Sequence, residues 1–120
     1  MKINTLVCHC SIGAMIALST SCTKIDKDME SVTVAHGDTL KYSLGGFGDE
    51  EGATIEKQPQ HAQFSDLDRR GDSGEMIYLY VAESDYLGAD YVELRSARGS
   101  DGASKNRDVI ITKLNIEVTE

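Results

Sequence analysis

The sequence predicts an all-β protein in which two antiparallel sheets, with about seven strands in total, pack face to face as a sandwich. Three observations lead to this prediction. Apolar and polar residues alternate from Ser31 onward, glycine-rich and acidic turns separate the alternating runs, and no stretch after Glu30 repeats its apolar residues every 3.6 positions. Short strands with frequent turns are typical of a two-sheet sandwich.

The expected strands follow one another along the chain with a turn after each. Residues 45–52 contain four glycines and three acidic residues, so they are expected to form a loop. Pro59 ends the third strand because it has no N–H for a ladder. In the last run, the apolar residues Val109 and Ile111 stand at odd positions, and those from Leu114 onward stand at even positions. Such a switch predicts a β-bulge near Thr112 and Lys113. Strands are therefore expected around Val32–Val34, Leu40–Leu44, Ala53–Lys57, His61–Ser65, Met76–Val81, Asp90–Ser96 and Val109–Val118, with further loops at 66–74 and 98–107.

The start of the chain has the three parts of an export signal. Lys2 supplies a positive end, Leu6–Leu18 is mostly apolar, and the small residues Ser19–Ser21 lead to Cys22. This arrangement resembles a bacterial lipoprotein signal peptide. The resemblance implies that residues 1–21 are removed and that Cys22 becomes the lipidated first residue, anchored in the outer membrane at its periplasmic face or at the cell surface. A secreted protein without an anchor and a cytosolic protein are the alternatives.

Residues 22–30 are expected to hold the lipidated cysteine and a short tether, and residues 31–120 the single domain. Thr23–Glu30 is polar and shows no periodicity. Fully stretched, these eight residues reach about 26–29 Å, at roughly 3.3–3.6 Å per residue. Their three acids loosely resemble an acidic signal for surface display, but a plain solvated linker is the interpretation we favour.

Charge and cysteine content limit the partners of the mature chain. Removing Lys2 leaves 11 of the 12 basic side chains against 20 acidic ones, a net charge near −9. Nucleic acid is therefore not expected as a partner, since its binding needs a basic face. Cys8-His9-Cys10 resembles a metal clip but lies in the segment expected to be removed. With Cys22 acylated, no thiol is left for a disulfide, so packing has to stabilise the domain.

Several short elements resemble those of bacterial cadherin-like and immunoglobulin-like domains. They are Gln58-Pro59-Gln60-His61-Ala62-Gln63-Phe64, then Gly74 and Tyr80, then Tyr86-Leu87-Gly88-Ala89-Asp90. The resemblance implies a sandwich of that kind, a role in adhesion, display or spacing, and no catalysis. It also implies that Tyr86 is a corner tyrosine with its hydroxyl bonded to nearby backbone, and that Asp90 braces the same corner through side-chain to backbone hydrogen bonds.

The residues that could carry out catalysis are few, so neither an enzymatic activity nor a cofactor is expected. The mature chain has two histidines, no thiol nucleophile and no serine in a recognisable nucleophile motif. The acids Asp49–Glu51 could bind calcium, but the spacing of a calcium loop is missing, so no metal is expected. Arg70–Asp72 spells an integrin-binding tripeptide and is expected to be an ordinary turn.

Two surfaces are candidates for binding a partner. If the parity of Tyr78 and Tyr80 faces the core, then Ile77, Leu79 and Val81 point out of the sheet, where an apolar row could contact an envelope protein. The alternative is that a loop or the N-terminal strand covers this row. A carbohydrate-binding role is the second hypothesis, and it depends on exposed aromatic rings, for which only Phe47 and Tyr91 are plausible.

Overall fold

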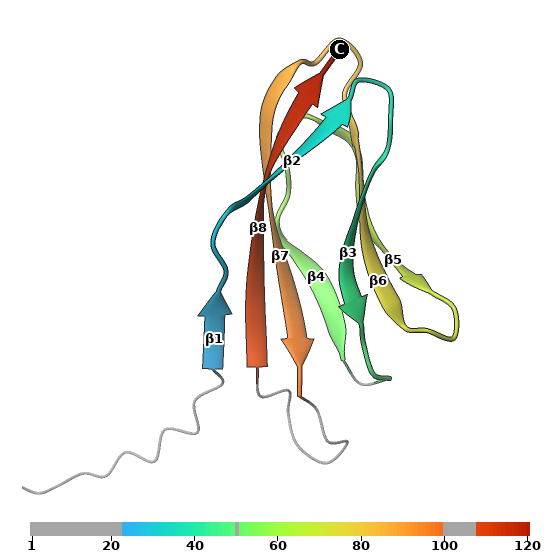
Figure 1. Ribbon diagram of the computed structural model, residues 1–120, viewed down its shortest axis with the longest axis vertical. Coiled ribbons are helices and arrows are strands. Elements are labelled where there is room, and N and C mark those ends of the chain that lie inside the picture. Colours follow the sequence, from blue (N-terminus) through green and yellow to red (C-terminus); the bar gives the residue numbers. More distant parts are fainter. Residues whose placement is uncertain (1–22, 50, 100–107) are drawn as a thin grey trace, which may run out of the picture.

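The computed structural model describes residues 23–49, 51–99 and 108–120, which form eight strands (Figure 1). The signal peptide expected at 1–21 and the lipid site at Cys22 lie outside the described residues. Within the described part of the chain, no helix is long and apolar enough to cross a membrane. The strands are β1 (Thr23–Asp26), β2 (Glu30–Ala35), β3 (Leu40–Gly46), β4 (Gly52–Lys57), β5 (Ala62–Arg70), β6 (Glu75–Ala82), β7 (Gly88–Arg98) and β8 (Asp108–Thr119).

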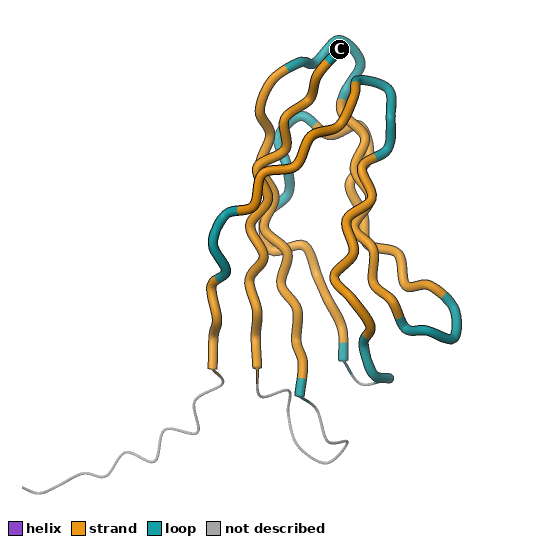
Figure 2. Tube along the Cα trace, in the orientation of Figure 1, coloured by secondary structure: helices purple, strands orange, loops and turns teal. Residues whose placement is uncertain are grey.

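The strands form two sheets, which Figure 2 shows as two layers joined at their ends. The first sheet has the order β1–β8–β7–β4, with β2 also beside β8, and the second has the order β3–β6–β5. The predicted all-β, two-sheet architecture is confirmed, with eight strands instead of about seven. Pairing is antiparallel except on one edge of β8, where β1 and β2 both run parallel to it.

The core lies between the sheets and is made by the inward rows of the central strands. Tyr78 and Tyr80 on β6 have no exposed surface, so the tyrosine parity faces the core as expected. Each phenol has a partner: the Tyr78 hydroxyl lies 2.8 Å from Ser65 Oγ, and Tyr80 donates to Asp90 Oδ2 at 2.9 Å. Burial raises the pKa of Tyr78 to about 12, so both its packing and its hydrogen bond belong to the neutral phenol. The other core members are Val34, Ala82, Val92, Leu94, Leu114, Ile116 and Val118.

The expected tether differs from the structure, because its first four residues form β1. Thr23 pairs with Asp108 and Asp26 with Ile111, and the Lys27 N–H then donates to the Ile111 carbonyl at 3.0 Å. β2 begins at Glu30, so only residues 27–29 separate the two strands. The sequence did not predict β1 for a physical reason. β1 pairs through its backbone on a sheet edge and buries little, so its residues need not alternate between apolar and polar.

Two further expectations are wrong at the level of single strands. β5 continues to Arg70 through the expected loop at 66–74, because Leu67 packs inward while the charged residues beside it face solvent. β8 pairs with β7 in unbroken register, so the expected bulge near Thr112 and Lys113 is absent. The parity change instead coincides with a change of neighbour, since β1 pairs with β8 as far as Ile111 and β2 begins at Leu114.

The two ends of the sandwich carry different connections. The corner end contains residues 36–39, 58–61 and 83–87, joined by hydrogen bonds such as Glu83 N–H to the His61 carbonyl at 2.8 Å. The loop end contains residues 47–49, residue 51 and residues 71–74, together with the start of β1 and β8. Figure 1 shows the blue β1 arrow beginning at the loop end and the C-terminus lying at the corner end.

Candidate functional site

The outer face of the second sheet carries the apolar row that the sequence singles out. Because Tyr78 and Tyr80 face the core, Ile77, Leu79 and Val81 on β6 face away from it. Leu79 and Val81 are half-buried, but only 7% of Ile77 is exposed. The expectation of three exposed side chains is therefore wrong for Ile77, which lies in the central strand of its sheet and is flanked on both sides by neighbouring strands.

Phe64 extends this row, a position on the outer face that the sequence did not predict. It pairs with Val81 beside a bulge in β5, which puts the two side chains next to each other on the outer face. Its exposed fraction is 47%, one of the highest among the large apolar side chains of the described residues. We call Phe64, Leu79 and Val81 the apolar patch. The bulge near Ala62 shifts the alternation of inward and outward side chains in β5. A strict period of two therefore does not predict that Phe64 faces outward.

Charged side chains border the apolar patch on both sides. Asp66 pairs with Leu79, and Asp68 pairs with Ile77, so both carboxylates share the outer face with the patch. Lys41 on β3 pairs with Leu79 from the other side. All three charged residues are exposed. The face thus has an apolar centre with a mainly acidic border, the arrangement found at many protein interfaces.

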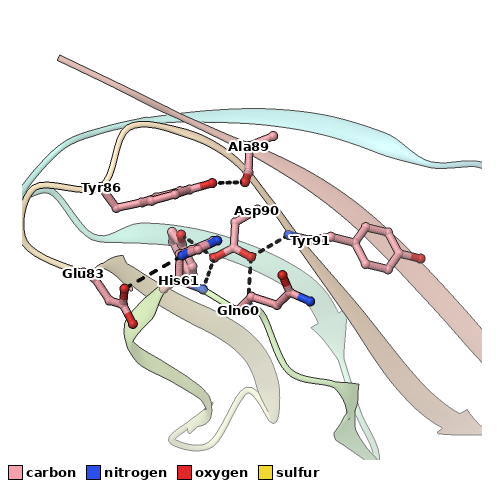
Figure 3. Close-up of polar contacts among 8 residues, drawn as sticks. Gln60, His61, Glu83, Tyr86, Ala89, Asp90 and Tyr91 are labelled. Carbon is pink, nitrogen blue, oxygen red and sulfur yellow. Dashed lines mark hydrogen bonds and ion pairs between the residues drawn. The ribbon is translucent and has the colours of Figure 1, made fainter.

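Asp90 joins the two sheets at the corner end through four hydrogen bonds (Figure 3). Its Oδ1 accepts the backbone N–H groups of Gln60 and Tyr91, and its Oδ2 accepts the His61 N–H and the Tyr80 hydroxyl, all at 2.9 Å. Asp90 belongs to β7 in the first sheet and Tyr80 to β6 in the second. The side chain is 5% exposed and fully partnered, so this geometry describes a structural brace rather than a reactive carboxylate.

Tyr86 occupies the connection before β7 and contacts both backbone and side chains. Its hydroxyl donates to the Ala89 carbonyl, and its ring stacks on His61 with 3.9 Å between centroids and 8° between planes. His61 Nδ1 lies 3.9 Å from Glu83 Oε2 at the surface. The hydroxyl contact agrees with the sequence-based expectation. The stacking was not predicted, because His61 lies 25 positions earlier and no local pattern links the two rings.

Phe47 is buried at the loop end and is not an exposed platform. Only 6% of its surface is accessible, and the Arg98 guanidinium lies 3.9 Å above its ring centroid. Arg98 also donates to the Gly46 carbonyl at 2.7 Å and to the Leu44 carbonyl at 2.6 Å. Gly74 packs against the backbone of Phe47, where a Cβ at position 74 would collide with the Phe47 carbonyl oxygen. The expectation of an exposed Phe47 ring is therefore wrong.

Tyr91 lies beside a shallow hollow on the outer face of the first sheet. The hollow has a volume of about 200 Å³ and is lined mainly by polar side chains. Tyr91 contributes a phenol ring to this lining. Lys57 Nζ lies 5.3 Å from the Tyr91 ring centroid, and the Tyr91 hydroxyl donates to Glu93 Oε1 at 2.7 Å. That hydrogen bond raises the pKa of Tyr91 to about 12. The amide side chains at the hollow are Gln58, Gln60 and Asn115.

The acidic loop considered for calcium has other contacts. Glu51 accepts the Gly48 N–H through Oε2 and the Gly99 N–H through Oε1, each at 2.9 Å. These backbone hydrogen bonds, Gly48 first, hold the pKa of Glu51 below its ordinary value. Among the described residues, no group of three His, Cys, Asp or Glu side chains gathers closely enough to hold a metal ion. Gly71 and Asp72 lie in the turn after β5.

Comparison with known proteins relates the chain to others by fold alone. No protein-family model matches the sequence, and no curated protein sequence matches it. An endo-fucoidan hydrolase of glycoside hydrolase family 107 is similar over 76% of this chain, with a TM-score of 0.52 and 10% identity, and this chain spans 12% of its length. A cysteine protease inhibitor from Entamoeba histolytica is similar over 79% of this chain and 92% of its own, with a TM-score of 0.48 and 10% identity. At identities this low, the similarity concerns the fold, and the functions of these proteins are not assigned to this chain.

Asp90→Asn tests whether the brace at the corner end stabilises the fold. The amide nitrogen of asparagine would meet N–H or O–H donors, so at least one buried donor loses its acceptor, at about 1–3 kcal/mol each. We expect the free energy of unfolding to fall by about 2 kcal/mol or more, measured by urea denaturation. Asp85→Asn is the matched control, because Asp85 is exposed at the same end and its φ of 69° suits asparagine. Equal stability of the two variants would contradict the brace.

Proposed function

We propose that this chain is a non-enzymatic lipoprotein of the cell envelope, anchored in the outer membrane through Cys22, whose sandwich acts as an accessory module for binding or adhering to another protein. The signal-like start of the sequence supports the anchor. The buried, fully bonded state of Asp90 supports a non-enzymatic role, since the most enclosed carboxylate of the described residues is committed to structure.

The strand order supports an immunoglobulin-like or cadherin-like assignment of the sandwich. In immunoglobulin domains one sheet contains strands B, E and D, and the other contains C, F and G. The order β3–β6–β5 corresponds to the first set, and β4–β7–β8 corresponds to the second. The tyrosine in the β6–β7 connection, Tyr86, occupies the place of the corner tyrosine between strands E and F.

The apolar patch is the observation that carries the protein-binding function. Phe64 exposes 47% of its surface directly beside the half-buried Val81 and close to Leu79. Large aromatic side chains surrounded by a polar border supply much of the affinity at protein interfaces. The patch lies on the outer face of a sheet, across the edge strand β5 and the central strand β6. Such a face suits a folded partner better than a small ligand, which needs a concave site.

The charges around the apolar patch define the chemistry of that partner. Asp66 and Asp68 border it on β5, and the chain as a whole carries a formal charge of −8. A partner surface with apolar centre and lysine or arginine at its edge would complement both features. We therefore expect binding to weaken as salt increases, because exposed charges are screened.

Phe64→Ser tests the apolar patch with little risk to the fold, since the side chain is about half exposed. Truncating an aromatic anchor costs about 2 kcal/mol or more, which is roughly thirtyfold in Kd. The native lipidated protein, immobilised on a support and incubated with detergent-solubilised envelope, should capture a partner. Immobilised Phe64→Ser should not retain that partner. Leu87→Ser is the matched control, because Leu87 is equally exposed, at 48%, but lies at the corner end.

Capture that is equally strong for native protein, Phe64→Ser and Leu87→Ser would rule out the apolar patch as the binding surface. Capture lost with Leu87→Ser alone would move the site to the corner end. Loss with both variants would indicate unspecific hydrophobic adsorption and would likewise contradict the proposal.

A carbohydrate-binding module is the second candidate, favoured by the hollow beside Tyr91. Amide side chains both donate and accept hydrogen bonds, which suits the hydroxyl groups of a sugar, and an aromatic ring suits its apolar face. Gln58, Gln60 and Asn115 provide the amides, and Tyr91 provides the ring. With about 200 Å³, the hollow would hold a single sugar ring of a glycan. Phe47 takes no part in this candidate because it is buried at the loop end.

Tyr91→Ala separates the two candidates when it is compared with Phe64→Ser. If the chain binds glycans, the native protein and Phe64→Ser should bind the same members of a glycan array, and Tyr91→Ala should lose them. If it binds a protein through the apolar patch, Tyr91→Ala should keep that partner. A native protein that binds nothing across the array would remove the glycan candidate.

A further inference from the structure

We infer that the sandwich stands on the membrane with its loop end against the lipid headgroups and its corner end pointing away. The inference rests on the proposed lipid anchor at Cys22. It specifies which surface of the domain meets the membrane and which surfaces stay free for a partner, neither of which follows from the presence of an anchor alone.

The first step is the short distance between the anchor and the first paired residue of the fold. Cys22 directly precedes Thr23, and consecutive Cα atoms are about 3.8 Å apart. Thr23 already pairs with Asp108 at the start of β8. The tether of eight residues that could span about 26–29 Å is therefore taken up by β1, the Lys27 hydrogen bond and β2.

The second step is the direction in which β1 enters the sandwich. β1 runs parallel to β8, so its first residue lies at the end where β8 begins, and β8 then leads away toward the corner end. The twelve residues of β8 cover about 40 Å at roughly 3.3 Å per residue. An acyl chain on the preceding residue holds the loop end at the membrane and leaves the corner end about that distance away (Figure 1).

The third step is an exposed apolar side chain beside the anchor. Ile25 is 45% exposed and pairs with Ile110, near the start of β8. Contact with the boundary between headgroups and acyl chains would cover this side chain, which otherwise remains in water. Met29 is 57% exposed but precedes Glu30, which pairs with Leu114, so it lies beside the middle of β8 and away from the membrane in this orientation.

Charge does not distinguish the two ends. The connections at the corner end contain Asp38, Glu83 and Asp85, and those at the loop end contain Asp49, Glu51 and Asp72. Basic side chains lie in the strands near both ends, with Lys41 and Lys57 near the corner end and Arg69 and Arg70 near the loop end. The orientation therefore follows from the position of the anchor and from the direction of β1.

Single cysteines at the two ends test this orientation. The mature chain has no cysteine beyond Cys22, so a thiol-reactive fluorophore would label only an introduced site. Asp72→Cys marks the loop end and Asp38→Cys marks the corner end, and both positions are exposed. The labelled, lipidated proteins would be reconstituted into vesicles that contain anionic lipid and a headgroup-attached quencher.

We expect most of the emission to be lost for the label at position 72 and little to be lost at position 38. Inserting ten glycine and serine residues after Cys22 provides a control that leaves the domain unchanged. Such a linker has an end-to-end distance of about 17 Å, so it should weaken quenching at position 72 and remove most of the difference. Equal quenching at both positions in the native chain, stronger quenching at position 38, or a difference that survives the insertion would overturn the inference.

Vesicle flotation separates this inference from the anchor on which it rests. Native protein that floats with vesicles, while Cys22→Ala does not, supports the anchor independently of orientation. If the native protein fails to float, the proposed anchor and the orientation both fail. If it floats but the two labels are quenched alike, only the orientation fails.

Discussion

The parallel pairing of the N-terminal chain with β8 is the constraint on which the arrangement of this molecule depends. β8 has β7 on one edge, and on the other edge it has first β1 and then β2. Its inward side chains Leu114, Ile116 and Val118 form the centre of the core. Because one strand serves three neighbours, the chain that follows Cys22 is built into the sandwich and does not hang from it.

This constraint gives the two ends and the two faces of the sandwich separate tasks. At the corner end, Asp90 holds both sheets together with four hydrogen bonds and leaves no free carboxylate oxygen for chemistry. At the loop end, Arg98 covers Phe47 and fixes the connection after β3. The faces between these ends carry the apolar patch and the hollow beside Tyr91. A domain held upright would present both faces sideways, accessible to partners in the same membrane.

Sequence reasoning was strongest where burial enforces a pattern. The alternation around Tyr78 and Tyr80 predicted which face of β6 is buried, because side chains of a strand between two sheets must divide into inner and outer rows. The turn residues before Asp90 marked the start of β7 in the same way. β1 was missed because Thr23–Asp26 pairs on an edge without burying a row of apolar side chains. Phe47 was misjudged because its cover comes from Arg98, 51 positions later, and no local pattern reports a cation above a ring.

Hydrogen exchange at the Lys27 amide tests the central claim, that the N-terminal chain is part of the sandwich. In the folded protein, this N–H should exchange much more slowly than in an unstructured peptide, because it donates to the Ile111 carbonyl at 3.0 Å and lies between two paired strands. The N–H groups of β2 that point toward β8 provide the reference for a paired strand. Protection of Lys27 together with β2 would agree with the account, whereas exchange at the peptide rate beside a protected β2 would contradict it.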